Sequence, residues 1–185
     1  MGTVWAKTDT KSSKYQLEKW ERQCLCEVWP SLLHKHPELF TVIWLEALEK
    51  SPPLKKLFHI AEDEDPKSND GFMAITINVE SFFQKLISCN LDDDHIRSEC
   101  QKVGAKHYQW CQAFESDAWS TFTASFLAAM DRSTSHLRGE QRSQVMRAWR
   151  KLVHYVIINM KIGISQQARI VESGLLGQKH NDRLI

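Results

Sequence analysis

The stretch FMAITINVESFFQKL at residues 72–86 indicates the fold class, because its apolar residues recur three and four positions apart. That spacing is typical of one face of an α-helix, whereas a half-buried strand alternates apolar and polar residues. The apolar face comprises Phe72, Ile75, Val79, Phe82, Phe83 and Leu86. We therefore expect a long amphipathic helix in this part of the chain.

The same periodicity continues through the central part of the chain, and no alternating β-branched run interrupts it. Pro52 and Pro53 open a short helix that ends near Phe58, a polar loop covers residues 60–70, and Gly163 is placed to end the last helix. The expected helices lie near residues 17–28, 37–48, 52–58, 72–86, 92–110, 116–130 and 140–161. Six to eight helices without a strand predict an all-α domain.

The 185 residues carry a net charge of +1, and 42% of them are apolar. This balance argues against disorder and against a strongly basic, nucleic-acid-binding surface. No apolar run approaches the ~20 residues of a membrane-spanning helix. We expect one domain at residues 17–163, between an N-terminal tail of residues 1–16 and a C-terminal tail of residues 164–185 with a short helix near Ile170–Leu176.

The cysteines indicate the compartment. There are five, widely spaced and without a Cys-x-x-Cys pair, which suits free thiols in a reducing environment. We therefore expect a cytoplasmic protein. Gly2 follows Met1 as in N-myristoylated proteins, but Ala6 stands where serine or threonine is preferred, which disfavours a membrane anchor.

Several landmarks follow one another in a particular order: Trp29, Pro52, Phe58, the segment VGAKH at 103–107, the segment WSTF at 119–122, and Trp149. In this order and spacing, residues 17–163 resemble the globins, most closely the neuroglobin-like and invertebrate branch. The resemblance implies a globin fold that holds one haem. No Cys-x-x-Cys-His motif is present to attach the haem covalently, so a b-type haem is implied.

The resemblance identifies His107 as the proximal histidine that binds the iron, and Gly104 as the glycine three residues before it. Val103 lies one helical turn before His107 and is expected to press the same haem face. Trp119 and Phe122 form part of an aromatic stripe that we expect to contact the haem, although such stripes are also typical of a plain core.

On the other side of the haem, the resemblance identifies Phe58 as the phenylalanine that stacks against it, after the helix that Pro52 opens. Trp29 is similar to the tryptophan of the family's first helix. The resemblance places Trp44 at a position whose side chain faces the bound ligand in the family. Its indole therefore either donates a hydrogen bond to a ligand, narrows the site, or packs between helices.

The distal position has several candidates. Counting 29 residues back from His107 reaches Asn78, which could donate an amide hydrogen bond or lie exposed beside Ile75 and Phe82; Ile75 and Val79 are the other candidates. No histidine occurs between His59 and His95, which argues against a second imidazole on the iron.

Other clusters have simpler explanations. Asp92, Asp93, Asp94 and His95 resemble a metal site in composition, but consecutive residues at a helix start point in different directions and suit a cap. Cys24 and Cys26 lie two apart on a helix and cannot face each other.

The resemblance implies a haem protein that binds oxygen, nitric oxide or carbon monoxide for sensing, storage or transport. The first alternative is a redox-active haem protein that transfers electrons or reduces nitrite or peroxide. The second is a haem-free helical interaction module. The expected partners are diatomic gases; a homodimer and a redox partner stay open.

Overall fold

The computed structural model describes residues 14–110 and 116–181. Within these ranges the chain is helical and has no strand, which confirms the all-α prediction. The α-helices are α2 Lys19–Lys35, α3 Leu39–Lys50, α4 Pro53–Leu57, α5 Asp70–Ser88, α6 Asp93–His107, α7 Ser116–Ser133 and α8 Gly139–Asn181, with 3₁₀ helices η1 Pro66–Ser68 and η2 Tyr108–Trp110. No helix in these ranges is long and apolar enough to cross a bilayer.

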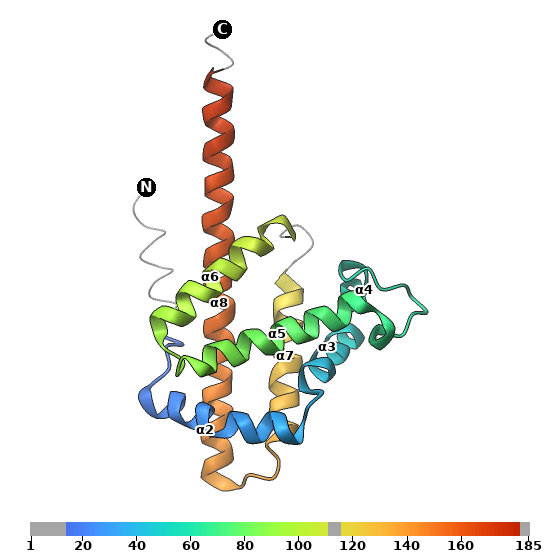
Figure 1. Ribbon diagram of the computed structural model, residues 1–185, viewed down its shortest axis with the longest axis vertical. Helices are drawn as coiled ribbons and strands as arrows, with labels where there is room; N and C mark the ends of the chain where they lie inside the picture. The colour runs from blue at the N-terminus through green and yellow to red at the C-terminus, as the bar shows by residue number, and fades with distance from the viewer. Residues whose placement is uncertain (1–13, 111–115, 182–185) are drawn as a thin grey trace.

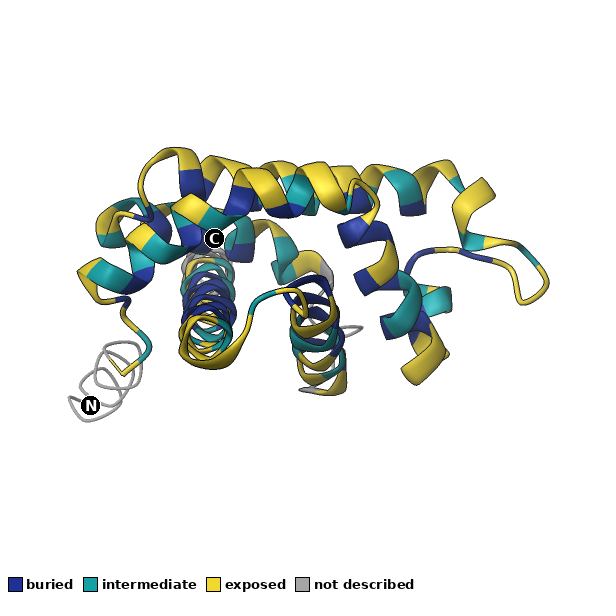
Figure 2. Cartoon of the chain, turned by 90° about the horizontal axis from the view of Figure 1, so that it is seen from below, coloured by how far each residue is buried: buried dark blue, intermediate teal, exposed yellow. Residues whose placement is uncertain are grey.

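The helices cross one another around a common interior. In Figure 1, α7 and α8 follow the long axis, and α2, α5 and α6 run across them. The pairs in contact include α6 with α8, α3 with α7, and α2 with α8. Figure 2 shows buried residues on the faces that the helices turn toward one another and exposed residues on their outer faces. This distribution is what the helical periodicity of the sequence predicts.

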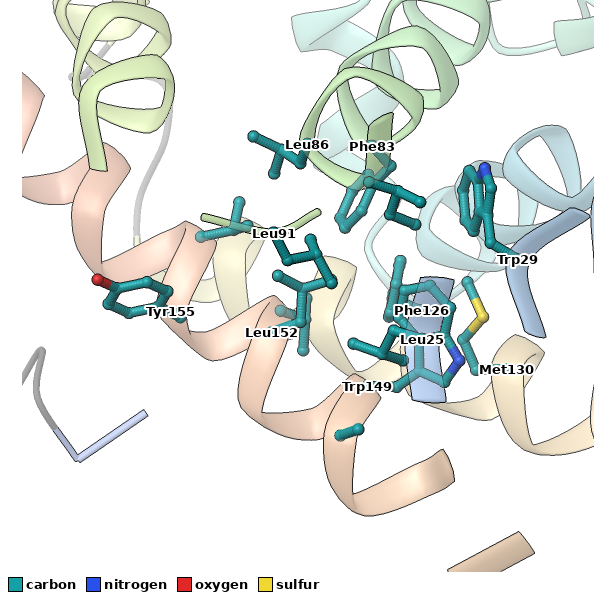
Figure 3. Close-up of a cluster of buried hydrophobic side chains, with 14 of the residues drawn as sticks. Leu25, Trp29, Phe83, Leu86, Leu91, Phe126, Met130, Trp149, Leu152 and Tyr155 are labelled. Carbon is teal, nitrogen blue, oxygen red and sulfur yellow. The ribbon is translucent and has the colours of Figure 1, made fainter. Parts of the chain in front are cut away.

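Bulky side chains from α2, α5, α7 and α8 form the main core (Figure 3). The ring centroids of Trp29 and Trp149 are 5.7 Å apart, and those of Phe83 and Phe126 are 5.2 Å apart. The indole N–H of Trp29 donates to Oε1 of Gln84 at 2.6 Å. Trp29, the landmark of the first helix, therefore ties α2 to α5 deep in the interior.

A smaller cluster lies around α4 and is here called the second core. Its buried members are Trp44, Ala47, Leu48, Leu54, Phe58, Ile60, Phe72 and Ala118. The expected break after α3 is confirmed, since α4 begins at Pro53, where a missing backbone N–H costs no helical bond. Asn69 caps α5 by accepting a 2.9 Å hydrogen bond from the backbone N–H of Phe72. The polar loop before it contains one 3₁₀ turn, η1.

The helix boundaries differ from the expected ones at three places. α2 continues to Lys35, beyond the expected end near residue 28, and α3 begins at Leu39, two residues after its expected start at Pro37. The prediction that Gly163 ends the last helix is wrong, since α8 is a single helix of 43 residues that continues to Asn181. The segment after Gly163 therefore holds more than a short helix near residue 170. Figure 1 shows this part of α8 extending beyond the other helices.

Close packing of α6 on α8 explains the glycine at position 163. A Cβ at Gly163 would lie 2.1 Å from the carbonyl oxygen of Gln101 on α6, and a Cβ at Gly104 would lie 2.0 Å from the carbonyl oxygen of Met160 on α8. Real side chains never approach a backbone oxygen so closely. Two glycines, one from each helix, thus allow the backbones to touch where α6 crosses α8.

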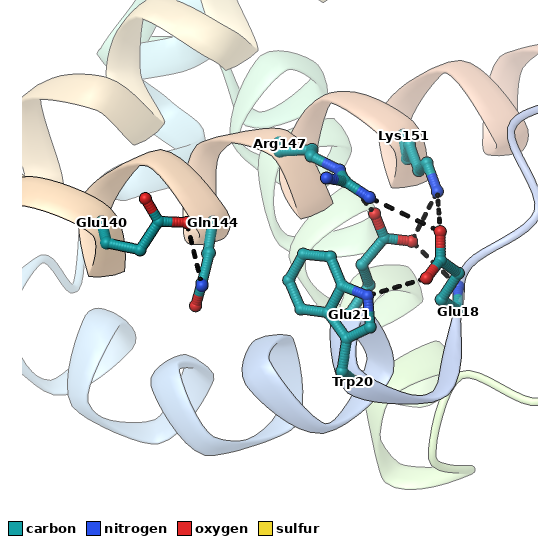
Figure 4. Close-up of polar contacts among 7 residues, drawn as sticks. All are labelled: Glu18, Trp20, Glu21, Glu140, Gln144, Arg147 and Lys151. Atoms are coloured by element: carbon teal, nitrogen blue, oxygen red, sulfur yellow. Dashed lines mark hydrogen bonds and ion pairs between the residues drawn. The ribbon is translucent and has the colours of Figure 1, made fainter.

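A buried carboxylate joins the start of α2 to α8 (Figure 4). Glu21 has no exposed surface, and its carboxylate lies 2.7 Å from Nζ of Lys151 and 3.2 Å from Nε of Arg147. It also accepts the backbone N–H of Glu18 at 2.9 Å. The hydrogen bond from the Trp20 indole lowers the pKa of Glu18, whose carboxylate faces the same two cations. Each buried oxygen of Glu21 thus has a charged or N–H partner, as burial of a charge requires.

Candidate functional site

The site begins at His107, the last residue of α6. Its Nδ1 lies 2.8 Å from the carbonyl oxygen of Val103. A carbonyl can only accept, so Nδ1 carries the proton and the ring lone pair is on Nε2. A metal-binding imidazole uses this arrangement, in which one nitrogen is fixed by a backbone oxygen and the other binds. His107 is half-buried.

Helix α7 supplies the wall next to His107. The rings of His107 and Trp119 have centroids 6.2 Å apart. Phe122 lies one turn after Trp119 and is half-buried, with its centroid 4.9 Å from that of Trp44 on α3. α7 therefore links the surroundings of His107 to those of Trp44. Trp119 is buried in the main core, whereas Phe122 remains partly exposed, so haem contact by this stripe stays a prediction.

Trp44 and Phe58 form the opposite end of the site. Their rings meet edge to face, with centroids 5.1 Å apart. Phe58 follows α4 directly, and its backbone N–H bonds the carbonyl oxygen of Leu54 at 3.1 Å, which holds the corner in place. The indole Nε1 of Trp44 is buried and has no hydrogen-bond partner in the part of the chain that the structure describes.

Helix α5 contributes the residues between these two ends. Ile75, Val79 and Phe82 are half-buried, so each presents apolar surface that the folded chain leaves partly uncovered. Asn78 is exposed; on an ideal helix it lies one turn before Phe82, at the edge of the same face. The three distal candidates, Asn78, Ile75 and Val79, therefore lie on one side of α5 together with Phe82, and the structure does not choose among them.

The two cores meet at this site. Val79 and Phe122 each pack against both clusters, while Phe82 and Val103 pack against the main core and Ile75 against the second. Nine of the ten predicted site residues thus form one continuous group of buried and half-buried side chains, and only Asn78 is exposed. Apart from His107, their side chains are apolar or aromatic.

The sequence analysis missed one charged residue beside this group. Nζ of Lys161 lies 6.0 Å from the ring centroid of Trp119. Lys161 follows Met160, which faces Gly104 where α6 crosses α8. Packing of α8 beside α7 brings this lysine close to the aromatic wall, and that tertiary contact has no local sequence pattern.

The other clusters do not compete as sites. Asp92 caps α6 by accepting the backbone N–H of His95 at 2.9 Å, as expected. No group of three potential metal ligands occurs among the described residues. Cys24, Cys26, Cys89 and Cys100 are free thiols, and burial raises the pKa of Cys100 far above its ordinary value; Cys111 lies outside the described residues, as do Gly2 and Ala6. An open groove of about 670 Å³ around Pro52 and Pro53 is lined by none of the predicted site residues.

Comparison with known proteins agrees with this geometry. A protein-family model described as Globin matches residues 41–160. "Globin-like protein 9" of Caenorhabditis briggsae is 25% identical over 156 residues, which cover 80% of this chain and 63% of that protein. The protein of the same name from Caenorhabditis elegans is 26% identical over 156 residues, or 80% of this chain and 61% of its own length. The chain thus spans less than two thirds of these relatives. No solved structure matches significantly.

Proposed function

Because the chain belongs to the globin family, we propose that it binds one b-type haem through His107 and uses it to bind small gaseous ligands, namely oxygen, nitric oxide or carbon monoxide, in sensing, storage or transport. One observation carries the proposal: Nδ1 of His107 is bonded to the Val103 carbonyl, within a group of half-buried aromatic and aliphatic side chains. The bound haem would supply an iron centre for the gas. Haem binding is typical of this family, which supports the assignment.

The residues present fit a haem in shape and chemistry. A haem is a broad apolar disc, and the half-buried faces of Ile75, Val79, Phe82, Val103 and Phe122 would gain burial against it. Trp119 and Phe58 would add aromatic contact at its two ends. Lys161, whose Nζ lies 6.0 Å from the Trp119 ring centroid, would offer a cation to the carboxylates that a haem carries.

The distal side favours binding of neutral gases over two-histidine coordination. α5 carries no histidine, and its half-buried residues Ile75, Val79 and Phe82 are apolar. Asn78 at the edge of this face could donate an amide hydrogen bond to a ligand. The alternative is a redox protein that reduces nitrite or peroxide. The same apolar residues of α5 support it, because apolar surroundings on the distal side favour oxidation of the iron.

Reconstitution with haem tests the proposal. The purified chain should take up one equivalent of haem and show a Soret band that shifts when carbon monoxide is added to the ferrous form. His107→Ala should abolish tight uptake, because no other described residue replaces the imidazole. His136→Ala, an exposed histidine between α7 and α8, is the matched control and should bind normally. An unchanged Soret band in His107→Ala would show that the proximal assignment is wrong.

A further inference from the structure

Two cysteines that are distant in the sequence meet at one carbonyl oxygen. The thiol of Cys26, on α2, donates to the backbone oxygen of Ile87 over 3.8 Å. The same oxygen accepts the backbone N–H of Cys89, the residue that follows the last turn of α5. α2 and α5 are in contact along this part of the fold. Cys26 and Cys89 are therefore neighbours in space, although the sequence alone shows them only as widely spaced thiols.

Both thiols are accessible, but to different degrees. Cys89 is exposed and Cys26 is half-buried. Burial, and to a smaller extent the carboxylate of Glu27, raises the pKa of Cys26. The exposed Cys89 is thus suited to react first with a molecule from solution, and Cys26 to react second. Cys100 is buried, and burial raises its pKa far above the ordinary value, so it does not compete.

The position of Cys89 allows a covalent bond to Cys26. A disulfide needs two Cα atoms roughly 4.4–6.8 Å apart, so cysteines that share one acceptor oxygen require only a local adjustment. Cys89 lies in the turn between α5 and α6, where Asn90 and Leu91 have left-handed φ angles of 53° and 52°. Because Cys89 belongs to this turn and not to a helix, it can approach Cys26 without unwinding α2 or α5.

An open groove of about 390 Å³ beside the pair offers a place for the oxidant. Its lining residues are Lys19, Arg22, Gln23, Cys26, Glu27 and Asn90, the neighbour of Cys89. Lys19 and Arg22 are cations, so the groove favours an oxidant that carries carboxylates. Glutathione disulfide is such a molecule, since each of its halves carries two carboxylates. Cys24 is not among the lining residues, because positions two apart on a helix face different sides.

We propose that Cys26 and Cys89 form a redox-sensitive disulfide, with glutathione disulfide as the oxidant. The Cys89 thiolate attacks one sulfur of glutathione disulfide, and one glutathione leaves as a thiolate. The Cys26 thiolate then attacks the Cys89 sulfur and displaces the second glutathione. Two cysteines are thereby oxidised and one glutathione disulfide is reduced to two glutathiones, which take up the two thiol protons. In reducing compartments, disulfides that do form are typically transient and redox-sensing.

The bond would tie α2 to the turn that joins α5 and α6. It would also close a long loop of chain between Cys26 and Cys89, which restricts the unfolded chain and stabilises the folded one. Oxidation should therefore make the fold more resistant to heat, and reduction should reverse the effect. None of these steps involves a haem, so the inference goes beyond the proposed function and is independent of it.

The test exposes the purified chain of 185 residues to glutathione buffers of increasing disulfide content. Free thiols are then blocked, and mass spectrometry maps the linked peptides. We expect a peptide that joins Cys26 to Cys89, and a melting temperature that rises by roughly 5–10 °C and returns after treatment with dithiothreitol. Cys26→Ser and Cys89→Ser should each abolish the linked peptide and the rise. Cys24→Ser, a half-buried thiol on another face of α2, is the matched control and should keep both.

Any of three results would overturn the proposal. The first is that Cys26 and Cys89 stay free at the highest disulfide content. The second is a glutathione adduct at Cys89 as the stable product of the parent chain. The third is a linked peptide that joins either residue to another cysteine or to a second copy of the chain. The mapping is made on the parent chain, so the outcome does not depend on the folding of the variants.

Discussion

The imidazole Nδ1 of His107 donates to the backbone carbonyl oxygen of Val103 over 2.8 Å, from one turn of α6 to the next. The acceptor belongs to the backbone of the same helix, so the ring orientation is tied to α6. Val103 is half-buried and packs against the main core, which keeps this turn of the helix in place. The orientation of the His107 ring is thus linked to a turn of α6 that the main core holds.

The first prediction concerns coordination of the iron. The haem-loaded ferrous protein should not show the six-coordinate spectrum of a bis-histidine haem at neutral pH, because no histidine lies between His59 and His95. Absorption spectroscopy checks this directly. If such a spectrum appears and persists in a His59→Ala, His95→Ala double variant, the second ligand comes from a more distant residue and the assigned distal side is wrong.

The second prediction concerns Phe58. Phe58→Ala should speed haem loss far more than it reduces helicity, because the ring lies at the edge of the site and follows a short helix. Removing a buried phenylalanine costs ~3–5 kcal/mol. We expect this loss mainly in the binding free energy of the haem and less in the stability of the fold. Phe40→Ala is the control, since Phe40 packs only in the main core; it should lower the melting temperature instead. Equal loss of helix and unchanged haem release in Phe58→Ala would make Phe58 an ordinary core residue.

The third prediction concerns the crossing of α6 and α8. An alanine in a helix is normally more stable than a glycine by ~0.5–1 kcal/mol. Gly104→Ala should do the reverse and lower the free energy of unfolding by about 1–3 kcal/mol, since its Cβ would lie 2.0 Å from the Met160 oxygen. Chemical denaturation measures the difference. Gly71→Ala, where the nearest atom is a side-chain oxygen of Asn69 at 3.1 Å, should change stability by no more than ~1 kcal/mol. Similar effects of both substitutions would contradict the close crossing.

The fourth prediction concerns pH. Hydrogen bonds from Lys85 at 2.6 Å and from Lys102 at 3.0 Å lower the pKa of Glu99 from 4.5 to about 2 in the folded chain. The unfolded chain therefore takes up the proton first as pH falls, so the stability from Glu99 is complete above pH 4.5 and is lost toward pH 2. Melting temperatures of Glu99→Gln should be below those of the parent at pH 7 and converge with them in acid. Glu172→Gln, an exposed residue of α8, should show no such convergence.

Local signals in the sequence were sufficient for most of the helices. Pro52 and Pro53 mark α4, Asp92 caps α6, and the spacing of apolar residues marks the buried face of α5. These features act over one or two turns, and their physical effect does not depend on distant parts of the chain.

The sequence was insufficient where tertiary packing overrides local preference. A glycine such as Gly163 is typical of a helix end, but here it lies where α8 crosses α6. The backbone that it faces, at Gln101, lies 62 residues earlier in the chain. Lys161 approaches Trp119 through the contact of α8 with α7, which is also a tertiary effect. The distal residue stays a prediction, because Asn78, Ile75 and Val79 are neighbours on α5 and a shift of one position exchanges them.

The contact of α6 with α8 also has a mechanical aspect. Backbone lies against backbone at Gly104 and Gly163, so no side-chain rotamer is available there to absorb a displacement of α6. Beyond this crossing α8 continues for 18 residues to Asn181, a length of about 27 Å at 1.5 Å per residue. If α8 tilted by about 10° at the crossing, its far end would move by about 5 Å. A change in the angle between α6 and α8 would therefore displace the far end of α8 more than any other part of that helix.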